Sequence, residues 1–148
     1  MRVGAFLVLL VTASCSGARK PSAAEERGRL IAARLDSAAI GDTITFRSLV
    51  SGVGDSLYVF PPYTPDSVVN RSLGFRWPEL DRTSISDYDN VTLWVLVANG
   101  AVVAWHEQLR NIDLADLGHG RPYPIGARFA VDSAPANGPG WRRLVAVR

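Results

Sequence analysis

The first apolar pattern after residue 21 has the spacing of a helix. Ser22 begins a capping box, S-A-A-E, in which the side chains of Ser22 and Glu25 can accept hydrogen bonds from backbone amides at the helix start. Apolar side chains then recur along one face: Leu30, Ile31, Leu35, Ala38 and Ala39. The pattern predicts a helix over about residues 23–40 that packs on a sheet, weakened by Gly28 and ended by Gly41. The alternative, a solvated spacer helix, would not need this stripe.

Two strands are predicted next. Residues 43–50 (TITFRSLV) alternate between polar and apolar side chains, and the glycines of residues 51–56 favour a hairpin loop. Residues 57–60 are apolar on both sides, which is typical of an inner strand. Pro61 and Pro62 should end this strand because neither has a backbone N–H to donate.

Residues 65–73 have the start, the apolar face and the stop of a short helix. Thr64 can cap the free amides of the first turn, and Pro65 suits the first helical position. Gly74 can adopt the left-handed conformation that ends a helix. We therefore expect a capped helix directly after the second strand.

Residues 91–107 have the clearest hairpin pattern. VTLWVLVA and AVVAWHE flank Asn99-Gly100, the pair most typical of a type I′ turn. With a two-residue turn and regular pairing, Trp94 faces Trp105 across the hairpin. Both faces are apolar, so we expect this hairpin to be central and covered on each side.

Two long connectors and a last pair of strands complete the pattern. Residues 76–90 and 108–126 show no clear period, although Ile112, Leu114 and Leu117 can pin the second connector to the core. Residues 128–132 and 141–147 alternate as strands do. This order predicts an α+β fold with a mainly antiparallel sheet of about six strands, an N-terminal helix and a short helix after strand 2.

Composition and charge narrow the classes of function. The chain has 148 residues, enough for one domain, and 47% of them are apolar, enough for a packed core. The formal net charge is +2 and the basic residues are scattered, so a nucleic-acid partner is not expected. Cys15 is the one cysteine, which excludes an internal disulfide and a cysteine-based zinc cluster.

The residues that precede Cys15 indicate a role for this cysteine. A positive start at Arg2 precedes the apolar run of residues 3–11, which is too short to span a bilayer, and small residues lead into Cys15. VTASCS resembles the lipobox of bacterial lipoproteins, which implies cleavage before Cys15 and diacylation of that residue. Thr12 departs from the leucine usual in that family. The alternative is an ordinary secretory signal that leaves a free thiol.

This resemblance predicts the organisation and the location of the chain. Residues 1–14 would be the signal peptide, residues 15–21 the lipidated cysteine and its tether, and residues 22–148 a single α+β domain. We expect attachment to the cell envelope through the N-terminal lipid, in the outer membrane of a two-membrane cell, with the domain facing the periplasm or the exterior. The mature part also resembles small uncharacterised envelope proteins, a likeness that implies no activity.

No motif in the sequence supports an enzyme. His106 and His119 lack the spacing of metal ligands, and residues 87–90 (DYDN) lack the glycine and glutamate of a calcium loop. There is no G-x-S-x-G nucleophile motif, and Asp113 and Asp116 lie in a connector, where acidic residues are usually solvated. No catalytic residue, metal or cofactor is therefore assigned.

The main functional hypothesis is a non-enzymatic domain that binds a protein or another envelope component through its long connectors, residues 76–90 and 108–126. The candidate surface residues are Tyr63, Trp77, Arg110, His119, Arg121 and Tyr123. The aromatic side chains among them could instead fill the core, which is the commoner use of large aromatics. Two alternatives remain: an envelope hydrolase that gathers His119, Asp113 or Asp116 and an arginine, and a periplasmic carrier with an enclosed apolar cavity.

Overall fold

The computed structural model of the protein describes residues 19–49 and 54–147. The expected signal peptide, Cys15 and part of the expected 51–56 loop lie outside the described residues. The elements in chain order are α1 (Ala23–Asp36), β1 (Thr43–Thr45), α2 (Phe46–Leu49), β2 (Ser56–Phe60), α3 (Asp66–Leu73), η1 (Pro78–Arg82), β3 (Val91–Ala98), β4 (Ala101–Leu109), β5 (Ile112–Asp113), η2 (Ala115–Leu117), β6 (Tyr123–Pro124), β7 (Arg128–Ser133), η3 (Pro135–Asn137) and β8 (Arg142–Ala146).

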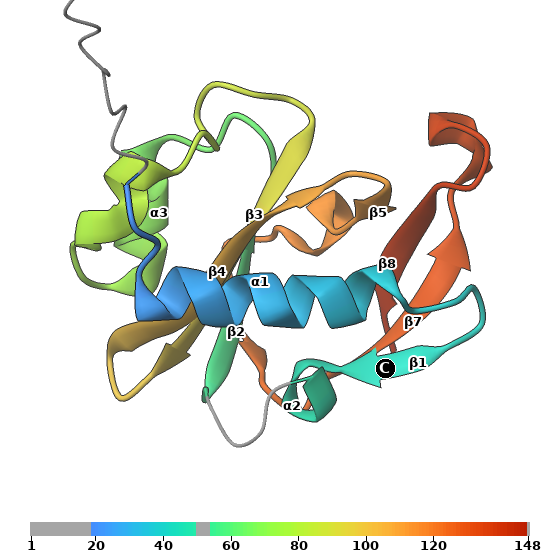
Figure 1. Ribbon diagram of the computed structural model, residues 1–148, viewed down its shortest axis with the longest axis horizontal. Coiled ribbons are helices and arrows are strands. Elements are labelled where there is room, and N and C mark those ends of the chain that lie inside the picture. Colours follow the sequence, from blue (N-terminus) through green and yellow to red (C-terminus); the bar gives the residue numbers. More distant parts are fainter. Residues whose placement is uncertain (1–18, 50–53, 148) are drawn as a thin grey trace, which may run out of the picture.

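The eight described strands form two sheets, with α1 lying across them (Figure 1). One sheet has the order β4-β3-β2-β6 and is antiparallel throughout. The other has the order β1-β7-β8-β5, in which β5 and β8 are parallel and the remaining pairs are antiparallel. The α+β prediction, with its N-terminal helix and its short helix after β2, is confirmed. The expected single sheet of about six strands is replaced by two sheets of four strands each.

The hydrophobic core lies on both sides of β3, whose residues 91–97 are all buried. On one side, Trp94 packs with Phe46, and Phe46 packs in turn with Phe129 beneath α1. On the other side, a second cluster lies between the sheet and the segment that contains α3 and η1; its members include Phe60, Val69, Trp77, Leu80 and Trp105. The expected coverage of both faces of the hairpin is confirmed, whereas its expected central position is not, because β4 is an edge strand of its sheet.

Helix α1 begins as expected and packs through part of the predicted stripe, since Ile31, Leu35 and the following Ala38 are buried. The Ser22 hydroxyl accepts a hydrogen bond from the Glu25 amide at 3.1 Å, which confirms the cap. The helix ends at Asp36, four residues before the expected end. Its buried residues are Gly28, Ile31, Ala32 and Leu35, whereas Leu30, placed on the apolar stripe, is 69% exposed.

The strand predicted over residues 43–50 is mostly wrong. Only Thr43–Thr45 is extended, and α2 follows at once. The Thr45 hydroxyl accepts from the Ser48 amide at 3.1 Å, a local bond that favours a helical turn over a strand. This turn buries Phe46 completely in the core. The expected hairpin between the first two strands is also wrong, because β1 pairs with β7 and β2 pairs with β3 and β6.

Helix α3 starts one residue later than expected and has no side-chain cap. Its first residue is Asp66 and its N-cap is Pro65. Thr64 was the expected cap, but its hydroxyl instead donates to the carbonyl of Pro61 at 2.6 Å, inside the proline turn. Gly74 ends the helix with φ 79°, in the left-handed region as expected.

The register of the β3–β4 hairpin corrects the expected tryptophan pair. Val97 lies opposite Val102, but Leu96 lies opposite Ala104, so Val103 is the extra residue of a β-bulge. The bulge shifts every later pair by one residue. Trp94 therefore faces His106, and Trp105 turns to the other side of the sheet, where it packs edge-on against Trp77 at 5.4 Å between ring centroids.

The two connectors contain short elements that the sequence pattern did not predict. Residues 76–90 include η1 and bury Leu80 and Ile85, and residues 108–126 include the end of β4, β5, η2 and β6. The expected anchors of the second connector, Ile112, Leu114 and Leu117, are all buried, which confirms their role. The last strand pair, β7 and β8, is confirmed, with Leu144 as the buried side chain of β8.

Candidate functional site

A surface groove runs beside β8, where β5, η2 and η3 meet that strand. It consists of two adjoining depressions of about 370 and 390 Å³, and Asp116 and Arg143 line both of them. Arg110, Asp113 and residues 133–137 complete the first depression. The second continues along the following side chains and backbone: Leu117, His119, Tyr123, Leu144, Val145 and Ala146. We call the whole depression the β8 groove.

A partly buried ion pair, between Arg110 and Asp113, shapes one end of the β8 groove. Arg110 donates to Asp113 Oδ2 through Nη2 at 2.7 Å and through Nε at 3.1 Å. The other oxygen of Asp113 accepts from the Ala115 amide at 2.9 Å, at the first residue of η2. The hydrogen bonds to Asp113 raise the pKa of Arg110, which therefore stays charged. This pair fixes the turn from β5 into η2 and leaves part of the guanidinium at the surface.

The middle of the β8 groove carries both signs of charge. Arg143 donates to Asp132 at 3.0 Å, and both side chains remain about half exposed. The hydrogen bond from Arg143, together with one from the Ser133 amide, lowers the pKa of Asp132. Among the described residues, no hydrogen bond or ion pair reaches the carboxylate of Asp116. A partner could therefore meet one carboxylate and one guanidinium that are both accessible to solvent.

The far end of the β8 groove is built by residues 117–123. Tyr123 donates its hydroxyl to the Leu117 carbonyl at 3.1 Å and packs its ring edge-on against Phe129 at 5.3 Å. Burial raises the pKa of Tyr123, so its hydroxyl remains a donor. Gly118 lies so close to Pro61 that a side chain there would overlap the proline ring. This contact places the loop that carries His119 against the proline turn.

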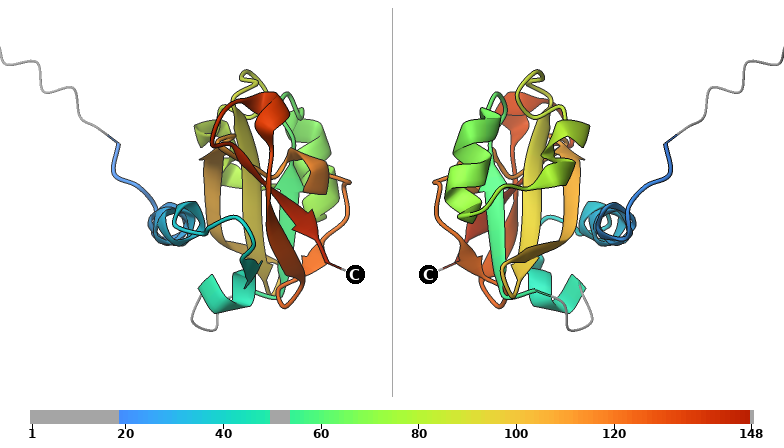
Figure 2. Two further views of the ribbon diagram at one scale, coloured as in Figure 1. Left: turned by 90° about the vertical axis from the view of Figure 1, so that its right-hand side faces the viewer. Right: turned by 90° about the vertical axis from the view of Figure 1, so that its left-hand side faces the viewer.

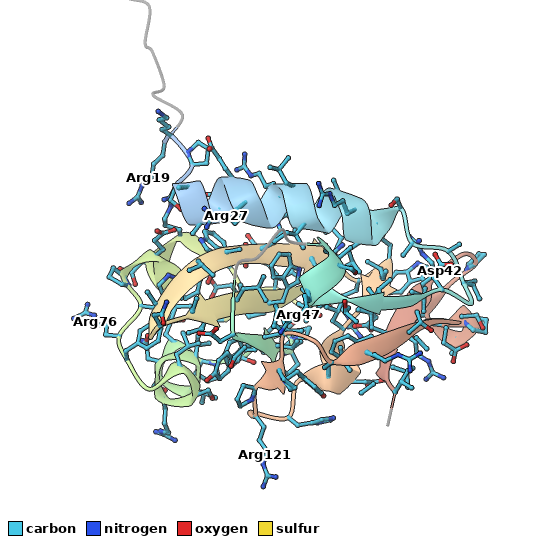
Figure 3. All side chains as sticks on the ribbon, turned by 90° about the horizontal axis from the view of Figure 1, so that it is seen from below. Arg19, Arg27, Asp42, Arg47, Arg76 and Arg121 are labelled. Carbon is cyan, nitrogen blue, oxygen red and sulfur yellow. The ribbon has the colours of Figure 1, made fainter. Side chains whose placement is uncertain are left out.

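The structure separates the six candidate surface residues into three groups. Arg110, His119 and Tyr123 line the β8 groove. Arg121 is exposed on the same loop as His119 and points into solvent (Figure 3). Tyr63 is 59% exposed with an unusual φ of 61° in the proline turn, whereas Trp77 is 4% exposed and belongs to the core.

The neighbouring residues Arg142 and Arg143 make different contacts, and only one of them lines the groove. Arg110 and Arg143 share the β8 groove. Arg142 instead donates to the carbonyls of Asp36 and Ala38 and holds the segment after α1. The Arg143–Asp132 pair was not identified from the sequence, although Asp132 and Arg143 face each other in the register of two alternating strands that the sequence did predict.

The remaining titratable groups do not form a second site. His106 lies beside Trp94 at 6.0 Å between rings, and burial lowers its pKa, which favours the neutral imidazole. Glu107 accepts from the amide and the hydroxyl of Ser84 and fastens the 76–90 segment to β4. Within residues 19–49 and 54–147, no three metal-ligating side chains come together.

The chain matches no family model, no curated protein and no solved structure. Among the described helices, none has the length and the apolar character needed to cross a bilayer.

Proposed function

We propose that the protein is a lipoprotein of the bacterial envelope, anchored through acylated Cys15. The supporting observation is the order of features at the N-terminus: a positive charge, a short apolar run, three small residues and the one cysteine of the chain. Two or more acyl chains give stable attachment, whereas a single chain binds a membrane only marginally.

Lipidation can be tested on the protein produced in a bacterial host. We expect mass spectrometry to find an N-terminal Cys15 that carries acyl chains, and the protein to sediment with membranes. Cys15→Ala should move the protein to the soluble fraction or leave it with its signal uncut. Ser14→Ala is the matched control, because it keeps a small residue before the cysteine, and it should remain acylated. An unmodified N-terminus at another residue in the unaltered protein would refute the proposal.

We further propose that the domain binds an envelope protein without catalysing a reaction, and that the β8 groove is the contact surface. The support is the groove itself, which combines exposed charges of both signs with the partly apolar wall of Leu117, Val145 and Ala146. Such mixed surfaces are typical of protein interfaces that form and dissociate.

The interface can be tested by crosslinking in cells with the anchored protein. A photo-crosslinking residue at His119 should capture one dominant protein, and one at Tyr88, exposed on another loop, should not. Arg143→Glu should abolish the His119 adduct, because it reverses the charge in the middle of the groove. Equal labelling from both positions, or no adduct from His119, would contradict this interface.

One observation favours the hydrolase as a second candidate. Asp116, His119 and Arg143 line the same depression, which is the grouping of an acid, a histidine and an arginine that such an enzyme needs. Hydrolysis of an envelope substrate by the purified protein, lost in Asp116→Asn and in His119→Gln, would establish it. The carrier has less support, because Leu35, Phe46 and Trp94 fill the space between α1 and the sheets.

A further inference from the structure

The outer face of α1 is positively charged and carries an exposed leucine. Leu30 is 69% exposed, the most exposed large hydrophobic side chain in the described part of the chain. The exposed basic residues on this face and just before it are Arg19, Lys20, Arg29 and Arg34. Arg29 pairs with Glu25 at 2.6 Å with 58% of its side chain still exposed, and Arg34 donates to the Leu49 carbonyl. The exposed acidic residues of α1 are Glu26 and Asp36. Basic residues close to a lipid anchor favour contact with anionic headgroups.

This excess of positive charge is local. Removal of residues 1–14, in which Arg2 is the one charged residue, lowers the formal net charge of the chain from +2 to +1. Residues 19–36 carry four exposed basic and two exposed acidic side chains, an exposed charge of +2, to which Arg19 and Lys20 contribute from the segment just before α1. Bacterial leaflets that contain anionic lipids attract such a face, by about 1 kcal/mol for each Lys or Arg near the surface.

The start of α1 is fastened to the rest of the protein. Arg82 donates to the Lys20 carbonyl at 3.1 Å and pairs with Glu25 at 2.9 Å. The Ser22 hydroxyl also donates to Glu79 at 2.6 Å. Because these contacts join α1 to η1, the residue from which the tether leaves has a fixed place beside the helix.

The chain between the described residue Arg19 and the lipid on Cys15 is short. Cys15 precedes Arg19 by four residues, and four residues span at most roughly 14 Å when fully extended. An acylated Cys15 lies at the membrane surface, so Arg19 must lie within this distance of the headgroups, and α1 begins four residues further along the chain, at Ala23. That length is comparable with the Debye length of about 8–10 Å, over which charged lipids act on the protein.

We propose that the outer face of α1 lies on the membrane surface, with its arginines against anionic lipid headgroups and Leu30 at the edge of the acyl region. This inference rests on the proposed acylation of Cys15. It also sets the orientation of the β8 groove. Figure 2 shows α1 end-on at one side of the sheets, and Figure 3 shows Arg121 on the side of the molecule opposite to α1. The loop that forms the far end of the groove therefore faces away from the membrane.

The orientation can be measured with fluorescent probes on the full acylated protein. Acylation consumes the one native thiol, so Leu30→Cys and Arg121→Cys each provide a single reactive site. Both positions are exposed, and labelling them leaves the core intact. Each labelled protein is reconstituted into vesicles of phosphatidylethanolamine and phosphatidylglycerol that contain a lipid with a headgroup-level nitroxide quencher. Mass spectrometry of the same samples verifies the acyl chains.

We expect strong quenching of the probe at residue 30 and little quenching of the probe at residue 121. Arg29→Gln with Arg34→Gln should weaken quenching at residue 30, since each lost charge lowers the affinity of the face for an anionic leaflet about fivefold. Arg121→Gln with Arg128→Gln removes the same charge elsewhere and should leave that quenching unchanged. Vesicles of phosphatidylcholine, which lack anionic lipid, should reproduce the loss.

Two outcomes would overturn the orientation. Equal quenching at both positions would show that the acylated protein tumbles on its tether, and stronger quenching at residue 121 would show that the opposite side faces the bilayer. In both cases, an acylated mass would still support the proposal that the protein is a lipoprotein. A mass without acyl chains would instead refute the anchor, and the orientation with it.

Discussion

At the scale of the residue, Gly28 determines how closely α1 approaches the sheet. The sequence pattern identified it as a weak point in a helix, because glycine has a low helix propensity. In the structure it faces the backbone of Trp105, and a Cβ at this position would overlap the Trp105 carbonyl oxygen. The missing side chain is therefore what allows the helix to contact β4 directly. Such a requirement depends on packing between distant segments and leaves no local signal in the sequence.

Gly28→Ala should destabilise the protein despite the better helix propensity of alanine. Propensity alone would stabilise α1 by about 1 kcal/mol, whereas overpacking typically costs about 1–3 kcal/mol and more where backbone is displaced. We expect a net loss, measured by chemical denaturation of the soluble Cys15→Ala protein.

Ala33→Gly on the exposed face of α1 provides the comparison. It removes helix propensity without changing packing and should cost about 1 kcal/mol. If Gly28→Ala proved more stable than the unaltered protein, α1 would not approach β4 as closely as described.

At the scale of the element, the bulge in β4 distributes the two hairpin tryptophans between the two sides of the core. The Asn99-Gly100 turn and both strands were predictable from alternation and turn chemistry. The bulge at Val103 was not, because a single extra residue leaves the alternation of each strand almost unchanged. The bulged residue is bound from elsewhere in the chain, since Arg27 of α1 donates to the Val103 carbonyl.

The bulge also brings Trp105 to a hydrogen-bond partner in η1. Its Nε1 donates to the Glu79 carboxylate at 2.9 Å, whereas Nε1 of Trp94 has no partner among the described residues. A double-mutant cycle of Trp105→Phe with Glu79→Ala should give a coupling free energy of about 1–2 kcal/mol, because the acceptor is charged.

The same cycle with Trp94→Phe in place of Trp105→Phe should give a coupling below about 0.5 kcal/mol. Urea denaturation of the four proteins in each cycle provides the values. Equal coupling in both cycles would mean that the Trp105–Glu79 hydrogen bond contributes nothing specific.

At the scale of the whole molecule, local patterns predicted most of the longer elements and the pairing of strands that are neighbours in the chain, but not the pairing of distant strands. The α+β class, α1, α3, the β3–β4 hairpin and the β7–β8 pair follow from periodicity, caps and turns that lie within short stretches of sequence. The division into two sheets depends on contacts between distant residues, such as Ile44 with Phe129, which no local pattern reports.

The candidate site was predictable to a similar extent. Both long connectors, 76–90 and 108–126, were predicted to form the contact surface. Arg110, His119 and Tyr123 of the second connector line the β8 groove, and no residue of the first does. The remaining wall comes from β8 and the η3 loop, which reach the groove only through the fold. Trp77 could not be distinguished from a surface aromatic by sequence alone, since its burial depends on the position of Trp105.

The pairing of β1 with β7 has a consequence for how the protein is made. Ile44 meets Phe129, so the second sheet cannot close until nearly the entire chain is present. High separation between contacting residues slows folding. A chain made from its N-terminus therefore keeps β1 without its partner until residue 130 has been synthesised. Truncation before β7 would leave the second sheet without β7 and β8, its two inner strands.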